Sequence, residues 1–151
     1  MKLRLLPLIL IILALVSCQF RRSNPLDPIG NPDVSTPQTI SNLIVYGVSG
    51  PGADNKYVEL RWDANNPLTT DGYFVYRGLA YNSSYAPVDT VGTNSCYHGS
   101  KPWHLVLSGI YWYKVSAYKD IYKDPSNPTP ANYLGRLEGR LSEARPVVVP
   151  A

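Results

Sequence analysis

Two cysteines and two histidines are the side chains of this 151-residue chain that most often carry nucleophilic or metal chemistry. Cys18 and Cys96 stand far apart, and neither His98 nor His104 has metal-ligand spacing to a cysteine or carboxylate cluster. The chain also lacks a glycine-rich phosphate loop and a G-x-S-x-G elbow. We therefore predict no catalytic residue, no metal, no cofactor and no enzymatic activity; a hydrolase with a site built from distant residues is the catalytic alternative.

Cys18 follows the first apolar run of the chain. Lys2 and Arg4 supply positive charge, and the twelve residues that end at Val16 are apolar apart from a compatible proline. This order is typical of a secretory signal peptide. A twelve-residue helix spans roughly 18 Å, which is short of a bilayer core of about 30 Å. We therefore predict a cleaved signal peptide over residues 1–17 rather than a spanning helix.

The residues Leu15, Val16, Ser17 and Cys18 resemble the lipobox of bacterial lipoproteins. In that family the cysteine thiol receives a diacylglycerol, the peptide is cut before the cysteine, and the new amino terminus is usually acylated. The resemblance implies lipidation of Cys18 and attachment to a membrane of the bacterial cell envelope. Gln19 replaces the aspartate that favours inner-membrane retention in enterobacteria, so the outer membrane is favoured. An ordinary signal peptide with an incidental cysteine is the alternative.

Residues 18–37 have the composition of a tether, with four prolines among polar residues. Such chains favour extended conformations of about 3.1 Å per residue, which limits the reach from the membrane to roughly 55 Å. Residues 24–28 can alternatively form a recognition motif.

Without Lys2 and Arg4 the net charge of +3 falls to +1, so we predict no nucleic-acid binding. If Cys18 is acylated, Cys96 has no disulfide partner and is expected to be a small buried side chain.

From Gln38 the sequence pattern changes to short alternating apolar runs separated by turn residues. No stretch has a helical period of useful length. This pattern predicts an all-β sandwich of about seven strands over residues 38–151. The expected strands lie near residues 40–45, 58–62, 73–77, 88–91, 94–97, 111–118 and 146–149.

Several of these runs resemble the fibronectin type III domain in order and spacing. The matching segments are Leu60–Trp62, Gly72–Arg77, Tyr111–Ala117 and Leu141–Val149. The resemblance covers about residues 38–149 and implies a seven-stranded immunoglobulin-like sandwich. It places Trp62, Tyr73, Val75, Tyr111, Val115 and Ala117 in the core, with the Tyr111 hydroxyl bonded to backbone upstream as in a tyrosine corner. The chain departs from that family's pattern in two places. The connection after Trp103 lacks the family's usual Leu-x-Pro-Gly spacing, and the span between the last two strands is unusually long.

If those core residues point inward, their strand neighbours point outward. The outward set is Phe74, Tyr76, Trp112, Lys114 and Tyr118. In the fibronectin type III arrangement the two strands are neighbours, so these side chains form one aromatic face, and exposed apolar patches tend to mark interaction sites. The alternative is that they cover one another as cross-strand pairs or lie beneath a loop.

Residues 119–140 contain three prolines and are predicted to form a long loop, a kind of segment that is often functional or disordered. Tyr122, Tyr133 and Arg136 are its candidate contact residues. The loop can also fold over Trp112, or be a loose insertion. Overall we predict a lipid-anchored module that binds or scaffolds an envelope protein, with glycan binding through the aromatic face as the alternative. The sequence predicts no oligomeric state.

Overall fold

The computed structural model describes residues 24–27, 29–31, 34–49, 56–99 and 105–151. The chain divides into two compact units, one that ends at Val34 and one that runs from Ser35 to Ala151. The predicted signal peptide and Cys18 lie outside the described residues. Within the part that is described, no helix is long and apolar enough to cross a membrane.

The described part of the first unit is turned rather than extended. The Leu26 amide donates to the Asn24 side-chain oxygen, and the Ile29 amide donates to the Asp27 carboxylate, both at 3.0 Å. Asparagine and aspartate favour such turns because their side chains offer the backbone a local acceptor. The second unit begins three residues before the predicted boundary, and its Pro37 is buried.

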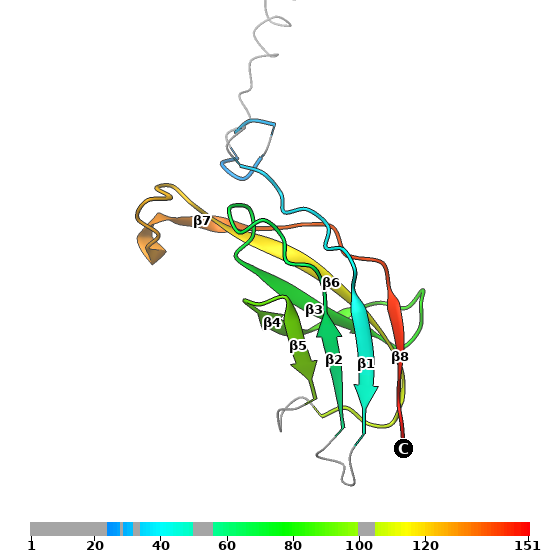
Figure 1. Ribbon diagram of the computed structural model, residues 1–151. Helices are drawn as coiled ribbons and strands as arrows, with labels where there is room; N and C mark the ends of the chain where they lie inside the picture. Colours follow the sequence, from blue (N-terminus) through cyan, green and yellow to red (C-terminus); the bar gives the residue numbers. More distant parts are fainter. Residues whose placement is uncertain (1–23, 28, 32–33, 50–55, 100–104) are drawn as a thin grey trace, which may run out of the picture. The chain divides into compact units, whose positions relative to one another are not determined.

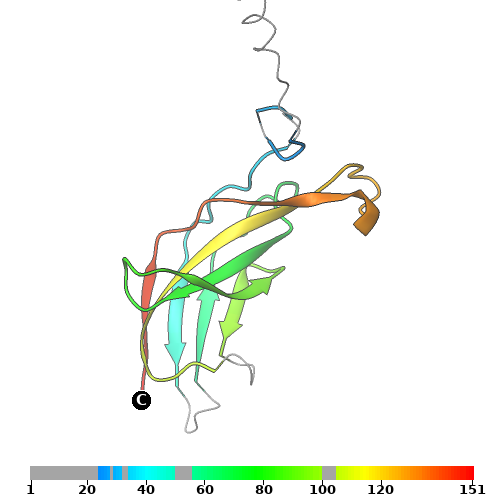
Figure 2. The same ribbon diagram turned by 180° about the vertical axis from the view of Figure 1, so that it is seen from behind.

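Two antiparallel sheets make up the second unit (Figures 1 and 2). The three-stranded sheet has the order β1-β2-β5, and the five-stranded sheet has the order β4-β3-β6-β7 with β8 also paired to β6. The strands are β1 (Ile44–Val48), β2 (Tyr57–Arg61), β3 (Gly72–Gly78), β4 (Ala86–Val91), β5 (Ser95–His98), β6 (Gly109–Tyr122), β7 (Tyr133–Glu138) and β8 (Arg145–Val149). The predicted all-β sandwich is confirmed.

The described chain has eight strands rather than seven because two strands share one edge of β6. β8 pairs with residues 109–113 and β7 with residues 118–122. Between them the Gly139 amide donates to the Ala117 carbonyl at 2.8 Å, and the Ser142 amide donates to the Val115 carbonyl at 2.9 Å. The prediction of a loop over residues 119–140 is therefore wrong: β6 continues to Tyr122, β7 returns beside it, and the three prolines are confined to the connection between them.

The core lies between the two sheets and follows the period of two expected for strands. Five of the six predicted core residues are less than 5% exposed: Trp62, Tyr73, Val75, Val115 and Ala117. Trp62 and Tyr73 pack edge to face with ring centroids 5.1 Å apart. The sixth, Tyr111, is half-buried against the core, and its hydroxyl donates to the Leu107 carbonyl at 3.1 Å. This bond to backbone four residues upstream has the form that the resemblance implied.

β1 and β8 approach closely at the edge of the sandwich. A Cβ atom added at Gly47 would lie 2.1 Å from the Val148 carbonyl oxygen, a distance that real Cβ atoms do not adopt. The obstacle is backbone, which cannot rotate away as a flexible side chain can. Glycine at position 47 therefore permits β1 to lie against β8.

We expect Gly47→Ala to lower the free energy of unfolding by about 2 kcal/mol, because overpacking a closely packed contact costs about 1–3 kcal/mol. For a unit of this size the melting temperature falls by about 4 °C per kcal/mol. Thermal unfolding followed by circular dichroism measures the loss. Gly92→Ala is the matched control because nothing lies within 4 Å of its added Cβ. Equal melting temperatures for the two variants would contradict the close approach.

Candidate binding surface

The outward side of the five-stranded sheet carries the predicted aromatic face. The structure brings Phe74 and Tyr76 from β3 together with Trp112, Lys114 and Tyr118 from β6 on this side, and all five are half-buried. Phe74 and Tyr118 lie with ring centroids 4.8 Å apart. The rings thus cover one another in part, as the alternative interpretation of the sequence holds.

The same side continues into the hairpin of β6 and β7. Asp120 and Arg136 are directly opposed in the register, and the guanidinium binds the carboxylate through two bonds of 2.7 and 2.8 Å. The guanidinium carbon also lies 3.8 Å from the ring centroid of Tyr118 and 5.5 Å from that of Phe74. Arg136 therefore joins the hairpin to the aromatic side chains of the sheet by charge and by cation–π contact.

Tyr122 and Tyr133 are close together near the end of the hairpin. They form a cross-strand pair with ring centroids 5.6 Å apart, and the Tyr133 hydroxyl donates to Asp120 at 3.3 Å. Both tyrosines of the expected loop are thus strand residues that stabilise the hairpin. Their alignment could not be read from the sequence because the register shifts by one residue beside Tyr122.

Two carboxylates on this surface, Asp120 and Glu138, bind polar side chains. The Arg136 guanidinium lowers the pKa of Asp120, and the same pair raises the pKa of Arg136. Glu138 accepts hydrogen bonds from the Tyr76 hydroxyl at 2.7 Å and from the Ser116 hydroxyl. Burial, and then the bond to Glu138, raise the pKa of Tyr76 to about 12. These groups hold the hairpin against the sheet.

Trp112 lies at the other end of β6 from the hairpin. Its ring contact comes from Tyr81, which lies between β3 and β4, with an edge-to-face geometry and centroids 5.3 Å apart. Lys114 places its ammonium 4.4 Å from the ring centroid of Tyr85. Residues 119–140, which the sequence allowed to fold over Trp112, pair instead with residues 118–122 of β6 through β7. The neighbour of Trp112 is Tyr81, which the sequence did not suggest.

An exposed aliphatic pair lies beside Trp112 on the same side of the sheet. Ile110 and Val148 are directly opposed in the register and are 61% and 62% exposed. The next outward pair is Trp112 with Pro146. We call these four residues the apolar patch. Ile110 and Val148 are not among the residues predicted for this face, although both share the outward parity of Trp112 and Pro146.

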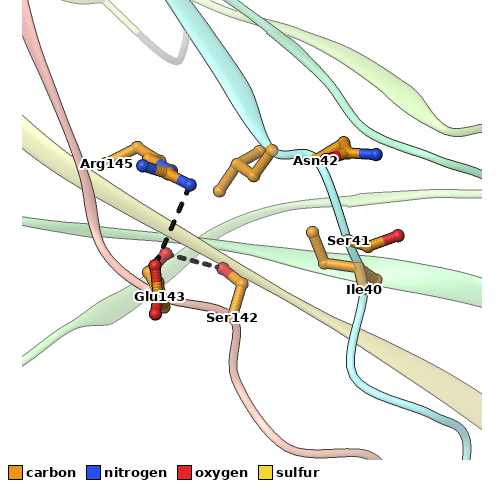
Figure 3. Close-up of a pocket in the computed structure, with 7 residues that line it drawn as sticks. Ile40, Ser41, Asn42, Ser142, Glu143 and Arg145 are labelled. Carbon is orange, nitrogen blue, oxygen red and sulfur yellow. Dashed lines mark hydrogen bonds and ion pairs between the residues drawn. The ribbon is translucent and has the colours of Figure 1, made fainter.

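Two hollows in the described part of the domain are small or lined by side chains with structural roles. One, of about 160 Å³, lies beside the chain that enters β1, and Ile40, Leu43 and Arg145 are among its lining residues. Figure 3 shows Ile40 and Arg145 with other residues around it. Ligand pockets usually measure about 300–1,000 Å³. A second, of about 300 Å³, includes Asn65 and Asn94, whose side-chain amides donate to backbone carbonyls and so hold the loops.

Of the cysteines and histidines, the two that the structure describes, Cys96 and His98, have structural partners. His98 is buried with its Nδ1 atom 2.8 Å from the Tyr113 hydroxyl, and burial raises the pKa of Tyr113. Cys96 is buried with its sulfur 3.6 Å from Asp89. Among the described residues no group of three or more histidine, cysteine or acidic side chains can hold a metal ion. His104 lies outside the described residues.

We expect a double-mutant cycle of Asp120→Asn and Arg136→Gln to give a coupling energy of about 1 kcal/mol at neutral pH, as for a well-aligned surface pair. Because the folded state lowers the pKa of Asp120, the coupling is complete above the ordinary aspartate pKa of about 3.9. It is lost as the pH falls through the lower pKa of the folded state. Urea unfolding at several pH values measures it, and a coupling that declines between pH 6 and 5 contradicts the lowered pKa.

Comparisons with known proteins identify the fold. No family model matches the chain, and no curated protein matches it. A solved Fn3-like protein from Clostridium thermocellum is similar, with 17% identity, a TM-score of 0.50, and coverage of 78% of this chain and 97% of that chain. The twitchin kinase region from C. elegans is 13% identical, with a TM-score of 0.49, and is covered over only 17% of its length and 78% of this chain. From the first likeness and the strand order, the chain has a fibronectin type III-like β-sandwich.

Proposed function

We propose that this protein is a lipoprotein of the bacterial cell envelope, anchored through Cys18, whose fibronectin type III-like domain binds a protein partner without catalysis. The apolar patch is the observation that carries the proposal. Ile110 and Val148 expose most of their side chains on a regular sheet surface, next to Trp112 and Pro146. Contiguous exposed apolar side chains of this kind are typical of interaction sites.

The chemistry of the patch favours a protein partner over a glycan. A sugar ring stacks on a free aromatic face. Near the patch, Arg136 lies over one face of Tyr118 and Lys114 over one face of Tyr85. Tyr81, which packs edge to face on Trp112, is the exposed ring there, at 59%. The most exposed part of the patch is aliphatic and offers no hydrogen-bonding group. Apolar centres with a polar rim are usual in protein interfaces. The expected partner therefore presents an apolar surface, with acidic groups where it meets Lys114.

The anchor is proposed from the sequence. Leu15, Val16, Ser17 and Cys18 supply the lipobox-like motif after an apolar run. Each buried methylene group of an acyl chain contributes about 0.8 kcal/mol, so two or more chains hold a protein at a membrane without a spanning helix. The outer membrane is the proposed location because glutamine follows Cys18 in the sequence.

The partner is tested with a photo-crosslinking amino acid introduced at Ile110 in the full chain, expressed in its native bacterium. We expect one protein product from this position. The yield should fall about tenfold when Val148→Glu is added, because a buried unpaired carboxylate costs more than 1 kcal/mol. The matched control is Ile44, which is 47% exposed on the outward side of the three-stranded sheet and should give no such product.

The glycan alternative is tested in the same preparation. Soluble envelope polysaccharide should leave the crosslinked product unchanged if the partner is a protein. Displacement by polysaccharide, or equal crosslinking from Ile110 and Ile44, would contradict the proposed protein-binding patch.

Lipidation is tested by growing cells with a clickable fatty acid. We expect label in the unsubstituted chain and none in Cys18→Ser, which should also be released from the membrane fraction. Cys96→Ala is the matched control because it removes the other cysteine, which is buried, and should keep its label. Label that persists in Cys18→Ser would contradict lipidation at Cys18.

A further inference from the structure

β7 presents an edge that is suited to pairing with another strand. It lies at the margin of the five-stranded sheet, and no described strand occupies its second side (Figures 1 and 2). The opposite margin, β4, carries Pro87 and a register shift, features that discourage strand pairing. β5, at a margin of the other sheet, is only four residues long. β7 has six residues and no proline.

The hydrogen-bond pattern shows which backbone groups point outward. Gly139 donates its amide to Ala117 of β6, and backbone direction alternates along an antiparallel strand. Leu137 therefore directs its backbone groups toward β6, as Gly139 does. Arg136 and Glu138 direct theirs away from β6. The outer edge thus offers two residues with donor and acceptor available, separated by Leu137.

Side-chain contacts hold this edge in place. Two-stranded ribbons are only marginally stable on their own. Here Arg136 is bound to Asp120, and Lys119 donates to Asp71 at 2.8 Å on the connection before β3. The Asp120 amide also donates to Asp71, at 2.8 Å. The strand is therefore ordered before it meets a partner, which lowers the entropy cost of binding.

We propose that β7 pairs with β7 of a second copy of this chain, antiparallel about Leu137. A two-fold axis at Leu137 places Arg136 of each copy opposite Glu138 of the other, so both cross-strand pairs join opposite charges. The two Leu137 side chains meet at the axis. The interface is self-complementary, as two-fold symmetry requires. The resulting sheet runs continuously through both molecules.

Charge selects this register over its neighbours. The outward faces of the two sheets match only if the two-fold axis passes through a residue rather than between two residues. The alternative registers therefore shift the axis by one residue at a time. An axis at Arg136 places two guanidinium groups opposite each other, and an axis at Glu138 places two carboxylates opposite each other. An axis at Gly135 pairs Leu134 with Arg136 and brings no opposite charges together. Like charges in direct cross-strand opposition are destabilising.

The dimer leaves the proposed partner site free. The apolar patch lies on residues 110 and 112 of β6 and on β8, whereas β7 pairs with residues 118–122. The proposal therefore goes beyond the proposed function and does not depend on it. A pairing this short buries less than the roughly 1,200 Å² of a standard interface, so we expect a dissociation constant near 100 μM.

Disulfide trapping tests the register in the full chain, in membranes treated with a mild oxidant. Leu137→Cys places two thiols at a directly opposed, non-hydrogen-bonded pair whose Cα atoms lie about 4.5 Å apart, within the range that a disulfide spans. We expect its covalent dimer to form at least tenfold faster than that of Leu134→Cys. Leu134 is the matched control because it lies on the same strand and is 37% exposed, but is remote from its own copy in this register.

Equal rates for the two variants, or faster trapping of Leu134→Cys, overturn the proposal, as does pairing of β7 with a strand of another protein. Adding Ile110→Glu to Leu137→Cys should leave trapping unchanged, so loss of the proposed partner is distinguished from loss of the dimer. If Leu137→Cys alters the circular dichroism spectrum, sedimentation of the unsubstituted chain in detergent decides. A sedimentation coefficient constant from about 10 to 500 μM, a range that spans the expected dissociation constant, then overturns the proposal.

Discussion

The pairing of β6 on both of its edges is the constraint on which the rest of the domain depends. β3 occupies one edge from Trp112 to Tyr118, while β8 and then β7 occupy the other. The change between these two strands is made possible by Ser142, whose hydroxyl accepts the Val115 amide at 3.0 Å in place of a backbone carbonyl. Without the Ser142 hydroxyl the buried Val115 amide would lose its partner, at a cost of about 1–3 kcal/mol.

The sequence predicted the sandwich because the core strands have one buried and one outward side. Tyr73 and Val75 alternate with Phe74 and Tyr76, and the structure buries the first pair and half-buries the second. The sequence did not predict β7, because residues 119–122 and 133–138 contribute no side chain to the buried core and so lack its alternating pattern. The ion pair between them joins Asp120 and Arg136, which are sixteen residues apart in the sequence. A pattern based on local hydrophobic alternation does not contain that information.

The alternation of side chains along the strands also predicted part of the candidate surface. Parity along β6 places Trp112, Lys114 and Tyr118 on one side, so the sequence was sufficient to bring them together. Which rings remain accessible depends instead on where cations lie, and that depends on register. Arg136 lies over Tyr118 only because β7 returns beside β6. Composition alone therefore overstates the accessible aromatic surface: the predicted aromatic side chains on this side of the sheet are half-buried, whereas Ile110 and Val148 are 61% and 62% exposed.

A single strand thus connects the two surfaces proposed for recognition. Ile110 lies at the start of β6, and the residues paired with β7 lie at its end. Between them Ser116 and Tyr118 are held by Glu138 and Arg136, so the outward side of the strand is tied to the hairpin. If copies are anchored through Cys18 as proposed, confinement to one membrane raises their local concentration, as linkage does for tethered modules, and a short edge pairing can then be populated. A domain that binds a partner at one end of β6 and its own copy at the other would gather two partners in the plane of the membrane.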